Sequence, residues 1–374
     1  MSIPLYKPYL RGNERAYVDD CLDSGWISSR GEYVGKFEAA FRRFIGAEHC
    51  TSVCNGTVAL HLALLAAGIG PGDEVIVPTL TYIAPVNAIA YVGAKPVFAD
   101  MCADTWQVNP MDVAGRITPR TRAILAVHLY EGPCDIVALQ TLCQQHGLAL
   151  IEDCAEAFGT SVNARHVGTF GDASTFSFFG NKSVTTGEGG MVVCRSRHLH
   201  DRCYLLKTQG VSPHREYEHN VLGYNYRMTN ICAAIGLAQL EAAGVILNRK
   251  RLISQFYRKA LRDLPVSFAP LREGERHSHW LCSIVLDDAE RRDPLRQHLA
   301  ARGIETRPFF RPAHTMPVFF EPKSYPVAEA LSARGLNLPS WPGLSEAELA
   351  FIADAVREHF AGAARRPALR VVSQ

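Results

Sequence analysis

The stretch Phe176-Ser177-Phe178-Phe179-Gly180-Asn181-Lys182 decides how this chain of 374 residues folds. An earlier apolar run ends in Ile151-Glu152-Asp153, and a glycine-rich run follows at residues 185–190. A lysine at the exit of one strand, with an aspartate at the end of an earlier one, is typical of a pyridoxal phosphate (PLP) site. The lysine amine forms a Schiff base with the cofactor aldehyde, and the aspartate keeps the pyridine nitrogen protonated. We therefore predict a PLP enzyme that uses Lys182 and Asp153.

Composition places few constraints on the partners of the chain. The formal net charge is +2 at pH 7, which gives no indication of binding to nucleic acid or to an anionic membrane. The first residues lack a basic stretch followed by an apolar core, and no apolar run is long enough to cross a bilayer. We therefore expect a cytoplasmic protein. The eleven cysteines show no Cys-x-x-Cys spacing, so we expect reduced thiols and no metal site.

Short runs rich in apolar and β-branched residues alternate with helical patterns between residues 50 and 195. Most of these runs are apolar almost throughout, as expected for parallel strands that helices cover on both faces. We therefore predict an α/β fold with a large, mixed and mostly parallel sheet. The predicted strands are 50–54, 74–78, 96–100, 123–128, 148–153, 175–178 and 191–194, with a buried helix at 58–67.

The length of the chain and its 47% hydrophobic content favour two domains. We assign residues 1–245 to a large cofactor-binding domain and residues 246–374 to a smaller C-terminal α+β domain. The elements predicted toward this end are a helical region at 228–264, a strand at 277–286, a helix at 293–302, a strand at 306–310 and a helix at 345–360, capped by Ser345. The final stretch, with Arg365, Arg366 and Arg370, is expected to be a loose tail.

Several polar residues follow the predicted strands at their carboxyl ends, where open α/β sheets bind ligands. Gly56 and Thr57 open a helix whose free amides suit a phosphate, and Ser177 can reach the same group with its hydroxyl. Tyr82 can stack on a flat cofactor ring. The sequence thus predicts a phosphate cradle and a ring contact beside the lysine.

Each of these residues also has an ordinary structural alternative. Gly56 and Thr57 suit a plain strand-to-helix turn, and Tyr82 suits the core. Asp153 can cap the helix that follows it, and Glu156 is also explained as a first-turn acid that the helix dipole favours. Their order at successive strand ends, rather than any single residue, favours the PLP site.

The motifs together resemble the sugar aminotransferases of the DegT/DnrJ/EryC1/StrS type, over about residues 3–360. The motifs that carry the resemblance are GWISS (25–29), NGTVALH (55–61), PTLTY (78–82), IED (151–153), the Lys182 loop and GYNYRMTN (223–230). Further segments resemble the members that aminate a nucleotide-linked 4-keto sugar: FFGNK (178–182), Arg307-Pro308 with His314, and GLNLP (335–339).

This resemblance implies the aspartate aminotransferase (type I) fold and a role for each matching residue. Lys182 binds the cofactor covalently, Asp153 pairs with the pyridinium nitrogen, Tyr82 stacks on the ring and Glu156 lies near the ring hydroxyl. The residues implied to hold the phosphate are Gly56, Thr57 and Ser177.

The resemblance also implies an obligate homodimer with shared active sites, because Asn225 reaches the phosphate from the neighbouring subunit. Trp26, Ser28 and His314 are implied to line the sugar-nucleotide pocket. One segment departs from the family pattern. Relatives commonly carry Gly-Gln after His-Leu-Tyr, whereas Glu131-Gly132 stands here, which adds a negative charge near the site.

The implied activity is transfer of an amino group from glutamate to the C4 keto carbon of a nucleotide-linked 4-keto-6-deoxyhexose, with Lys182 moving the proton. Three alternatives remain open at this point. One is transamination of another keto sugar or a keto-cyclitol in antibiotic biosynthesis, and another is a non-catalytic regulatory or scaffold protein of the same fold. A deoxysugar dehydratase is disfavoured, because that branch replaces the lysine with histidine. The sequence leaves open the nucleotide, the sugar stereochemistry and a destination in O-antigen or antibiotic glycosides.

Overall fold

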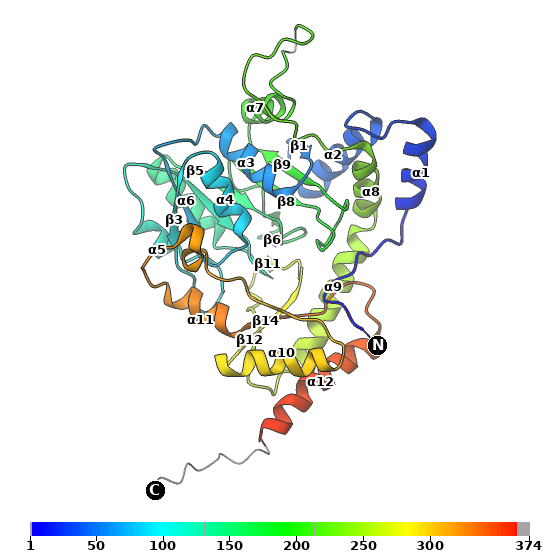
Figure 1. Cartoon of the computed structure of the whole chain (residues 1–374), viewed down its shortest axis with the longest axis vertical. Helices are drawn as coiled ribbons and strands as arrows, with labels where there is room; N and C mark the ends of the chain where they lie inside the picture. The colour runs from blue at the N-terminus through cyan, green and yellow to red at the C-terminus, as the bar shows by residue number, and fades with distance from the viewer. Residues whose placement is uncertain (1, 131, 213, 365–374) are drawn as a thin grey trace.

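A seven-stranded sheet forms the centre of the computed structural model, which describes residues 2–130, 132–212 and 214–364 (Figure 1). The strand order is β1-β9-β8-β5-β4-β2-β3. Only β9 runs antiparallel to its neighbours, so the predicted mixed, mostly parallel sheet is confirmed. The strands are β1 (His49–Val53), β2 (Glu74–Pro78), β3 (Lys95–Ala99), β4 (Thr121–Val127), β5 (Ala149–Asp153), β8 (Ala173–Ser177) and β9 (Gly190–Cys194).

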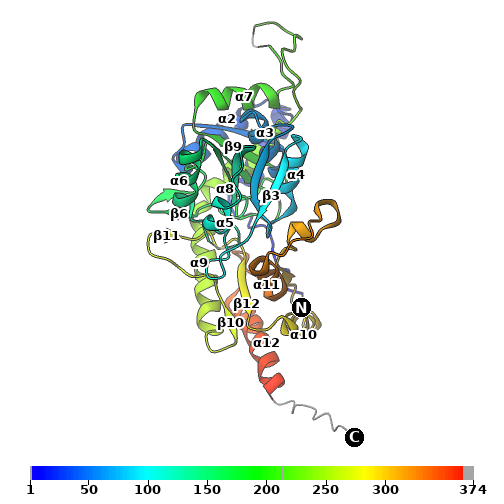
Figure 2. The same ribbon diagram turned by 90° about the vertical axis from the view of Figure 1, so that its left-hand side faces the viewer.

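Helices cover both faces of this sheet, which explains why its strands are apolar almost throughout. One face packs against α3 (Gly56–Ala66) and α4 (Ile83–Tyr91), and the other against α2 (Glu32–Ile45), α6 (Ile136–His146) and α8 (Asn230–Glu241). Figure 2 shows α4 and α6 on opposite sides of the strands. The remaining helices of this part are α1 (Glu14–Ser24), α5 (Pro110–Ala114) and α7 (Arg197–Lys207).

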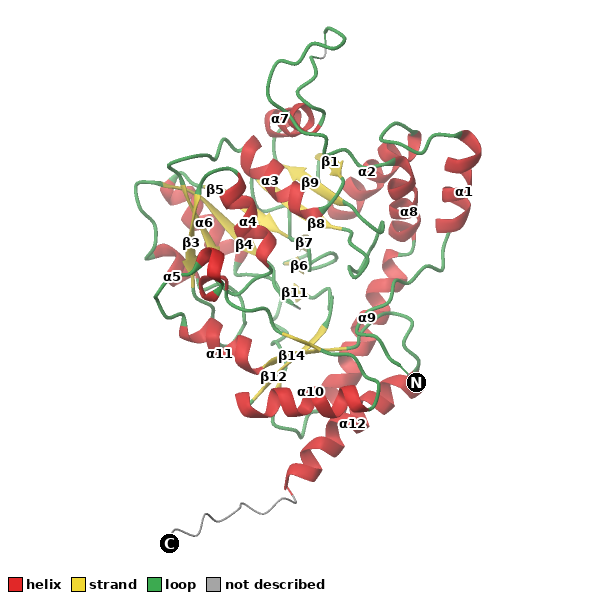
Figure 3. Cartoon of the chain, in the orientation of Figure 1, coloured by secondary structure: helices red, strands yellow, loops and turns green. Residues whose placement is uncertain are grey.

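A second, antiparallel sheet has its own hydrophobic core (Figure 3). Its strands, in spatial order, are β10 (Val266–Ser267), β12 (Cys282–Leu286), β14 (Gly335–Leu338) and β13 (Arg307–Pro308). The helices beside it are α9 (Ala243–Ala260), α10 (Arg292–Ala301), α11 (Pro326–Arg334) and α12 (Glu346–Ala364). Short elements complete the fold: β6 (Ser161–Val162), β7 (Arg165–His166), β11 (Glu275–Arg276), η1 (Ala289–Arg291), η2 (Ala313–Thr315) and η3 (Pro317–Phe319).

The predicted strand at 277–286 is wrong over its first half, because β12 begins only at Cys282. The Ser278 amide donates to the hydroxyl of Thr160, and His279 adopts a φ of 50°, which a β-strand does not allow. The predicted strand at 306–310 shortens to Arg307–Pro308, and the helical region 228–264 divides into α8 and α9, bent by 62°. The predicted cap of α12 is confirmed: Ser345 Oγ accepts the amide of Glu348 at 3.2 Å.

The start of the chain packs with the second core rather than with the large sheet. Ile3 is buried in that core and pairs with Ile304. The proposed domain boundary at 245/246 falls within α9 and stays a prediction. Glu131 and the arginines Arg365, Arg366 and Arg370 lie outside the described residues.

Within the described ranges, no single helix is both long and apolar enough to span a membrane. One bent pair, α8 with α9, passes that test by length and composition alone.

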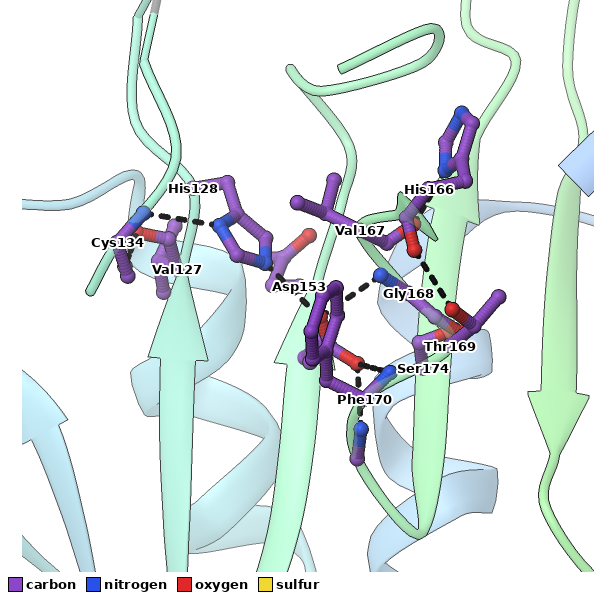
Figure 4. A network of polar contacts seen from close by, with 12 residues as sticks. Val127, His128, Cys134, Asp153, His166, Val167, Gly168, Thr169, Phe170 and Ser174 are labelled. Carbon is purple, nitrogen blue, oxygen red and sulfur yellow. Dashed lines mark hydrogen bonds and ion pairs between the residues drawn. The ribbon is translucent and has the colours of Figure 1, made fainter. Parts of the chain in front are cut away.

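The buried carboxylate of Glu152, near the end of β5, accepts several hydrogen bonds. Figure 4 labels three of its partners, His128, Gly168 and Phe170. The side chain of Glu152 accepts the amide N–H groups of Gly168, Phe170 and Gly171 at 2.6–2.8 Å. His128 Nε2 lies 3.1 Å from the same carboxylate, while the Cys134 amide donates to His128 Nδ1, so the ring proton faces Glu152. Burial acts to raise the pKa of Glu152, but these donors lower it overall, and the group is a charge held by the fold.

His128, Glu152 and Cys154 bring three ligand atoms within 4.8 Å of one another. The hydrogen bonds above already occupy the carboxylate and both nitrogens of the imidazole. The cluster is therefore explained as a hydrogen-bonded support for the sheet.

We expect Glu152→Gln to lower the free energy of unfolding by about 2–4 kcal/mol, because an amide nitrogen then faces backbone N–H donors in a buried site. Urea unfolding followed by circular dichroism measures the change. Glu346→Gln, at an exposed position of α12, is the matched control and should change stability by less than about 0.5 kcal/mol. Equal stability of the two variants would contradict the assigned role of Glu152.

Candidate active site

A cavity of about 700 Å³ lies between the carboxyl ends of the central strands and the second core. The structure brings seven of the predicted site residues to its wall. They are Gly56, Thr57, Tyr82, Asp153, Glu156, Ser177 and Lys182. Residues far apart in the sequence thus converge at the strand ends, as the α/β topology predicts.

The phosphate cradle is built where β1 passes into α3. Asn55 caps α3 by accepting the Val58 amide at 3.0 Å, which leaves the first amides of the helix facing the cavity. A Cβ placed on Gly56 would lie 2.8 Å from Cβ of Ser177, so only glycine fits this approach. Free amides, the positive end of a helix dipole and a serine hydroxyl together suit a phosphate group.

Asp153 ends β5 on the cavity face and is 5% exposed. Its carboxylate accepts the Ala155 amide at 2.9 Å, while its backbone carbonyl accepts the His128 amide at 3.1 Å. Burial raises the pKa of Asp153, although the positive charge of Lys182 opposes this. A protonated ring nitrogen at this position would supply the cation that favours an ionised Asp153.

The amine of Lys182 is held in poorly solvated surroundings. Its Nζ lies 4.1 Å from the ring centroid of Trp280, and burial lowers its pKa although Glu156 and Asp153 oppose the shift. Burial raises the pKa of Glu156 to about 7, and the Tyr130 amide donates to its carboxylate at 2.8 Å. A lysine with a lowered pKa is suited to covalent bonding and to proton transfer near neutral pH.

Two buried hydroxyls support the fit of PLP to this cavity. Thr81 and Thr175 are at most 1% exposed and line the cavity, yet their Oγ1 atoms find no hydrogen-bond partner among the described residues. Buried polar atoms of this kind are normally satisfied, so they indicate a polar ligand. Tyr82 is 57% exposed at the rim, where its ring offers a stacking surface.

Four predicted residues are not at the cavity of this chain. Trp26, Ser28 and Asn225 are exposed elsewhere on the surface. His314 is 3% exposed, with Nδ1 2.7 Å from Thr79 Oγ1 and Nε2 3.3 Å from Glu329. The structure therefore gives His314 a contact inside the core in place of the expected pocket lining.

Sequence reasoning missed several cavity residues. Trp280 lies in the segment predicted as plain strand, and Tyr6 lies in an N-terminal stretch without a motif. Arg307 was noted only as part of a resembling segment, yet its side chain lines the rim from the second sheet. No local signal marks Tyr6 or Trp280, because their role arises from long-range packing.

A mostly parallel sheet that presents a lysine, an aspartate and a helix N-terminus to one cavity defines the class of PLP-dependent transferases. The DegT/DnrJ/EryC1/StrS aminotransferase family matches residues 8–357, and the chain belongs to this family. Its members are PLP enzymes, so the cofactor expected from the sequence is confirmed, as are the fold and the aminotransferase class.

Individual relatives cover nearly the whole chain. A GDP-perosamine synthase of Escherichia coli O157:H7 is 54% identical over 96% of this chain and 98% of its own length. A GDP-perosamine synthase of Vibrio cholerae is 52% identical over 96% of this chain and 99% of its own. The aminotransferase TlmJ of Streptoalloteichus hindustanus superposes with a TM-score of 0.94 at 32% identity, covering 97% of this chain and 100% of that one.

We expect Glu156→Gln to flatten the pH dependence of stability in the cofactor-free protein. The pKa of Glu156 rises from an ordinary value of 4.5 to about 7 on folding, so the folded state binds more protons between these values. Its contribution is fully present below pH 4.5 and is lost as pH rises through 7, on the order of 2–3 kcal/mol.

Melting temperatures of wild type, Glu156→Gln and the control Glu346→Gln between pH 4.5 and 8 measure this difference. The difference in melting temperature between wild type and Glu156→Gln should change across that pH range. The difference between wild type and Glu346→Gln should stay constant. Parallel curves for all three proteins would show that the carboxyl of Glu156 is not protonated in the fold.

Proposed function

We propose that this chain transfers an amino group from glutamate to the C4 keto carbon of a GDP-linked 4-keto-6-deoxyhexose. The observation that carries the proposal is the similarity to two GDP-perosamine synthases, at more than half identity over nearly the full length of each chain. The cavity geometry supports it, since one wall offers the cofactor contacts and the opposite rim adds polar groups from the second sheet.

The chemistry of the reaction is divided between the cofactor and the protein. Bound PLP supplies an electron sink that makes the proton on the α-carbon of the donor removable. Gly56, Thr57 and Ser177 hold its phosphate, and Asp153 holds the proton on the ring nitrogen. Lys182 would hold the cofactor covalently through Nζ, and the same amine would accept the α-proton of the donor, since burial lowers its pKa and favours the uncharged form.

The rim of the cavity has groups suited to an anionic, hydroxyl-rich substrate. Arg307 projects from β13 with 60% of its side chain exposed, and among the described residues it forms an ion pair with Glu305 at 3.4 Å. Asn337 and Glu188 add an amide and a carboxylate group to the lining of the cavity. A guanidinium beside hydroxyl-binding groups matches the diphosphate and the sugar of a nucleotide sugar.

We infer further that two copies of the chain share their active sites. The long loop between α7 and α8 extends away from the body (Figures 1 and 2), and it exposes Tyr217 by 93% and Leu222 by 86%. Asn225 follows in this loop, outside the cavity of its own chain. Large apolar side chains on an extended loop favour burial against a second subunit, where Asn225 would reach the phosphate cradle.

To test the substrate, we would offer GDP-, UDP- and dTDP-linked 4-keto-6-deoxyhexoses to the PLP-loaded protein, with glutamate as donor, and detect aminated products by mass spectrometry. We expect the GDP-linked sugar to react fastest. Lys182→Ala should abolish turnover and the yellow absorbance, whereas Lys259→Ala, on the exposed side of α9, should retain both. Preference for another nucleotide, or amination of a keto-cyclitol alone, would overturn the substrate assignment.

Shared sites predict complementation between two inactive variants. Lys182→Ala and Asn225→Ala each lack one component of every site in their own homodimers. Denaturing and refolding them together should restore about a quarter of wild-type activity, because half of the dimers then contain one complete site of two. Refolding each variant alone is the control. Absence of any recovery in a mixture shown to contain mixed dimers would contradict the shared site.

A further inference from the structure

Two neighbouring peptide carbonyls in the lysine loop accept hydrogen bonds from rings outside the central sheet. Tyr6 Oη donates to the carbonyl of Lys182 at 2.6 Å, and Trp280 Nε1 donates to the carbonyl of Asn181 at 2.7 Å. These carbonyls belong to the reacting lysine and to the residue before it. The direction in which the lysine side chain leaves the backbone is therefore fixed from two sides.

The indole of Trp280 also contacts the far end of the same side chain. Its edge binds the Asn181 carbonyl, while its face lies 4.1 Å from Nζ of Lys182. A cation over an indole face is the most favourable of the cation–π pairs. One ring thus contacts both the backbone and the amine of the loop.

The buried side chain of Lys250 joins the two residues that hold the loop. Lys250, on α9, is 1% exposed, and its Nζ donates to the carbonyls of Trp280 at 2.7 Å and Ser340 at 3.3 Å. The same ammonium lies 4.9 Å from the ring centroid of Tyr6. One buried side chain therefore contacts both the ring of Tyr6 and the backbone of Trp280.

Hydrogen bonds to residues beside the second sheet hold the segment that carries Tyr6. Ile3 exchanges backbone hydrogen bonds with Gly303 and Glu305 at 2.8 and 2.9 Å, and the Leu5 amide donates to the Glu305 carboxylate at 3.0 Å. The N-terminal segment therefore packs along the second sheet and reaches the lysine loop at Tyr6. Burial raises the pKa of the Tyr6 phenol, so it remains a donor at all working pH values.

We propose that Tyr6 and Trp280, joined by Lys250, form a lysine clasp that positions the Lys182 loop for reaction. Backbone hydrogen bonds from the Lys182 amide to the Phe179 carbonyl and from the Thr186 amide to the Phe178 carbonyl, both at 2.9 Å, set the local turn of the loop. The clasp adds contacts from the second core, which hold the loop relative to the rest of the cavity. The inference rests on the proposed function only in that Lys182 is the reacting amine.

The test uses Tyr6→Phe and Trp280→Phe, which remove one donor each and keep an aromatic ring. Tyr9→Phe and Trp341→Phe are matched controls, because they remove the same groups outside the cavity lining. The first measurement is the rate at which cofactor-free protein captures added PLP on Lys182, followed by absorbance. We expect each clasp variant to capture about five- to tenfold more slowly, as loss of one hydrogen bond implies, and the controls to match wild type.

A second measurement is hydrogen exchange of residues 178–187 in cofactor-free protein, where exchange should be faster in the clasp variants than in the controls. The double variant should slow capture by less than the product of the two single effects, because both donors hold one loop. The proposal is overturned if PLP capture and loop exchange in the clasp variants stay at wild-type rates, whether or not the melting temperature changes. It is also overturned if the double variant slows capture by the full product of the two single effects. A wild-type protein that captures no PLP would instead refute the proposed function, while loop exchange would still test the clasp.

Discussion

The parallel pairing of β5 with β8 is the constraint on which the site depends. It sets Asp153 opposite Thr175, two residues before Ser177, so that the ring-nitrogen acid and a phosphate ligand leave the sheet at the same edge. The lysine loop begins directly after this strand. The N-terminus of α3 packs against the same edge. The amides that suit a phosphate, the carboxylate of Asp153 and the amine of Lys182 therefore line one cavity.

The poor solvation of this cavity gives its charged groups their reactivity. Burial lowers the pKa of Lys182 and raises those of Asp153 and Glu156. All three shifts disfavour the charged form of the group, and that of Glu156 brings its pKa to about 7. By contrast, Glu152, one residue before Asp153, is held ionised by three amides. The difference between the two acids comes from hydrogen-bond donors rather than from burial.

Sequence reasoning succeeded where a signal is local and failed where packing is distant. Short runs rich in apolar and β-branched residues predicted all seven strands of the central sheet, and motifs at their ends predicted Gly56, Ser177 and Lys182 as neighbours. His314 was expected at the pocket but lies in the core, because its contacts with Thr79 and Glu329 join segments that no pattern connects. Tyr6 and Trp280 reach the lysine across 176 and 99 residues of chain, a relation that no periodicity encodes.

The adjacency of Glu152 and Asp153 has a consequence for how the sheet tolerates change. Successive side chains of a strand point to opposite faces, so one acid enters the amide nest behind the sheet and the other enters the cavity. Sliding β5 by one position would place Ile151 in the amide nest and Glu152 in the cavity, or Asp153 in the nest and Cys154 in the cavity. Either slide leaves one of the two environments without its proper carboxylate. The alignment of this strand is therefore dictated electrostatically, and a one-residue insertion or deletion just ahead of Ala149 would be far more harmful than one in a surface loop.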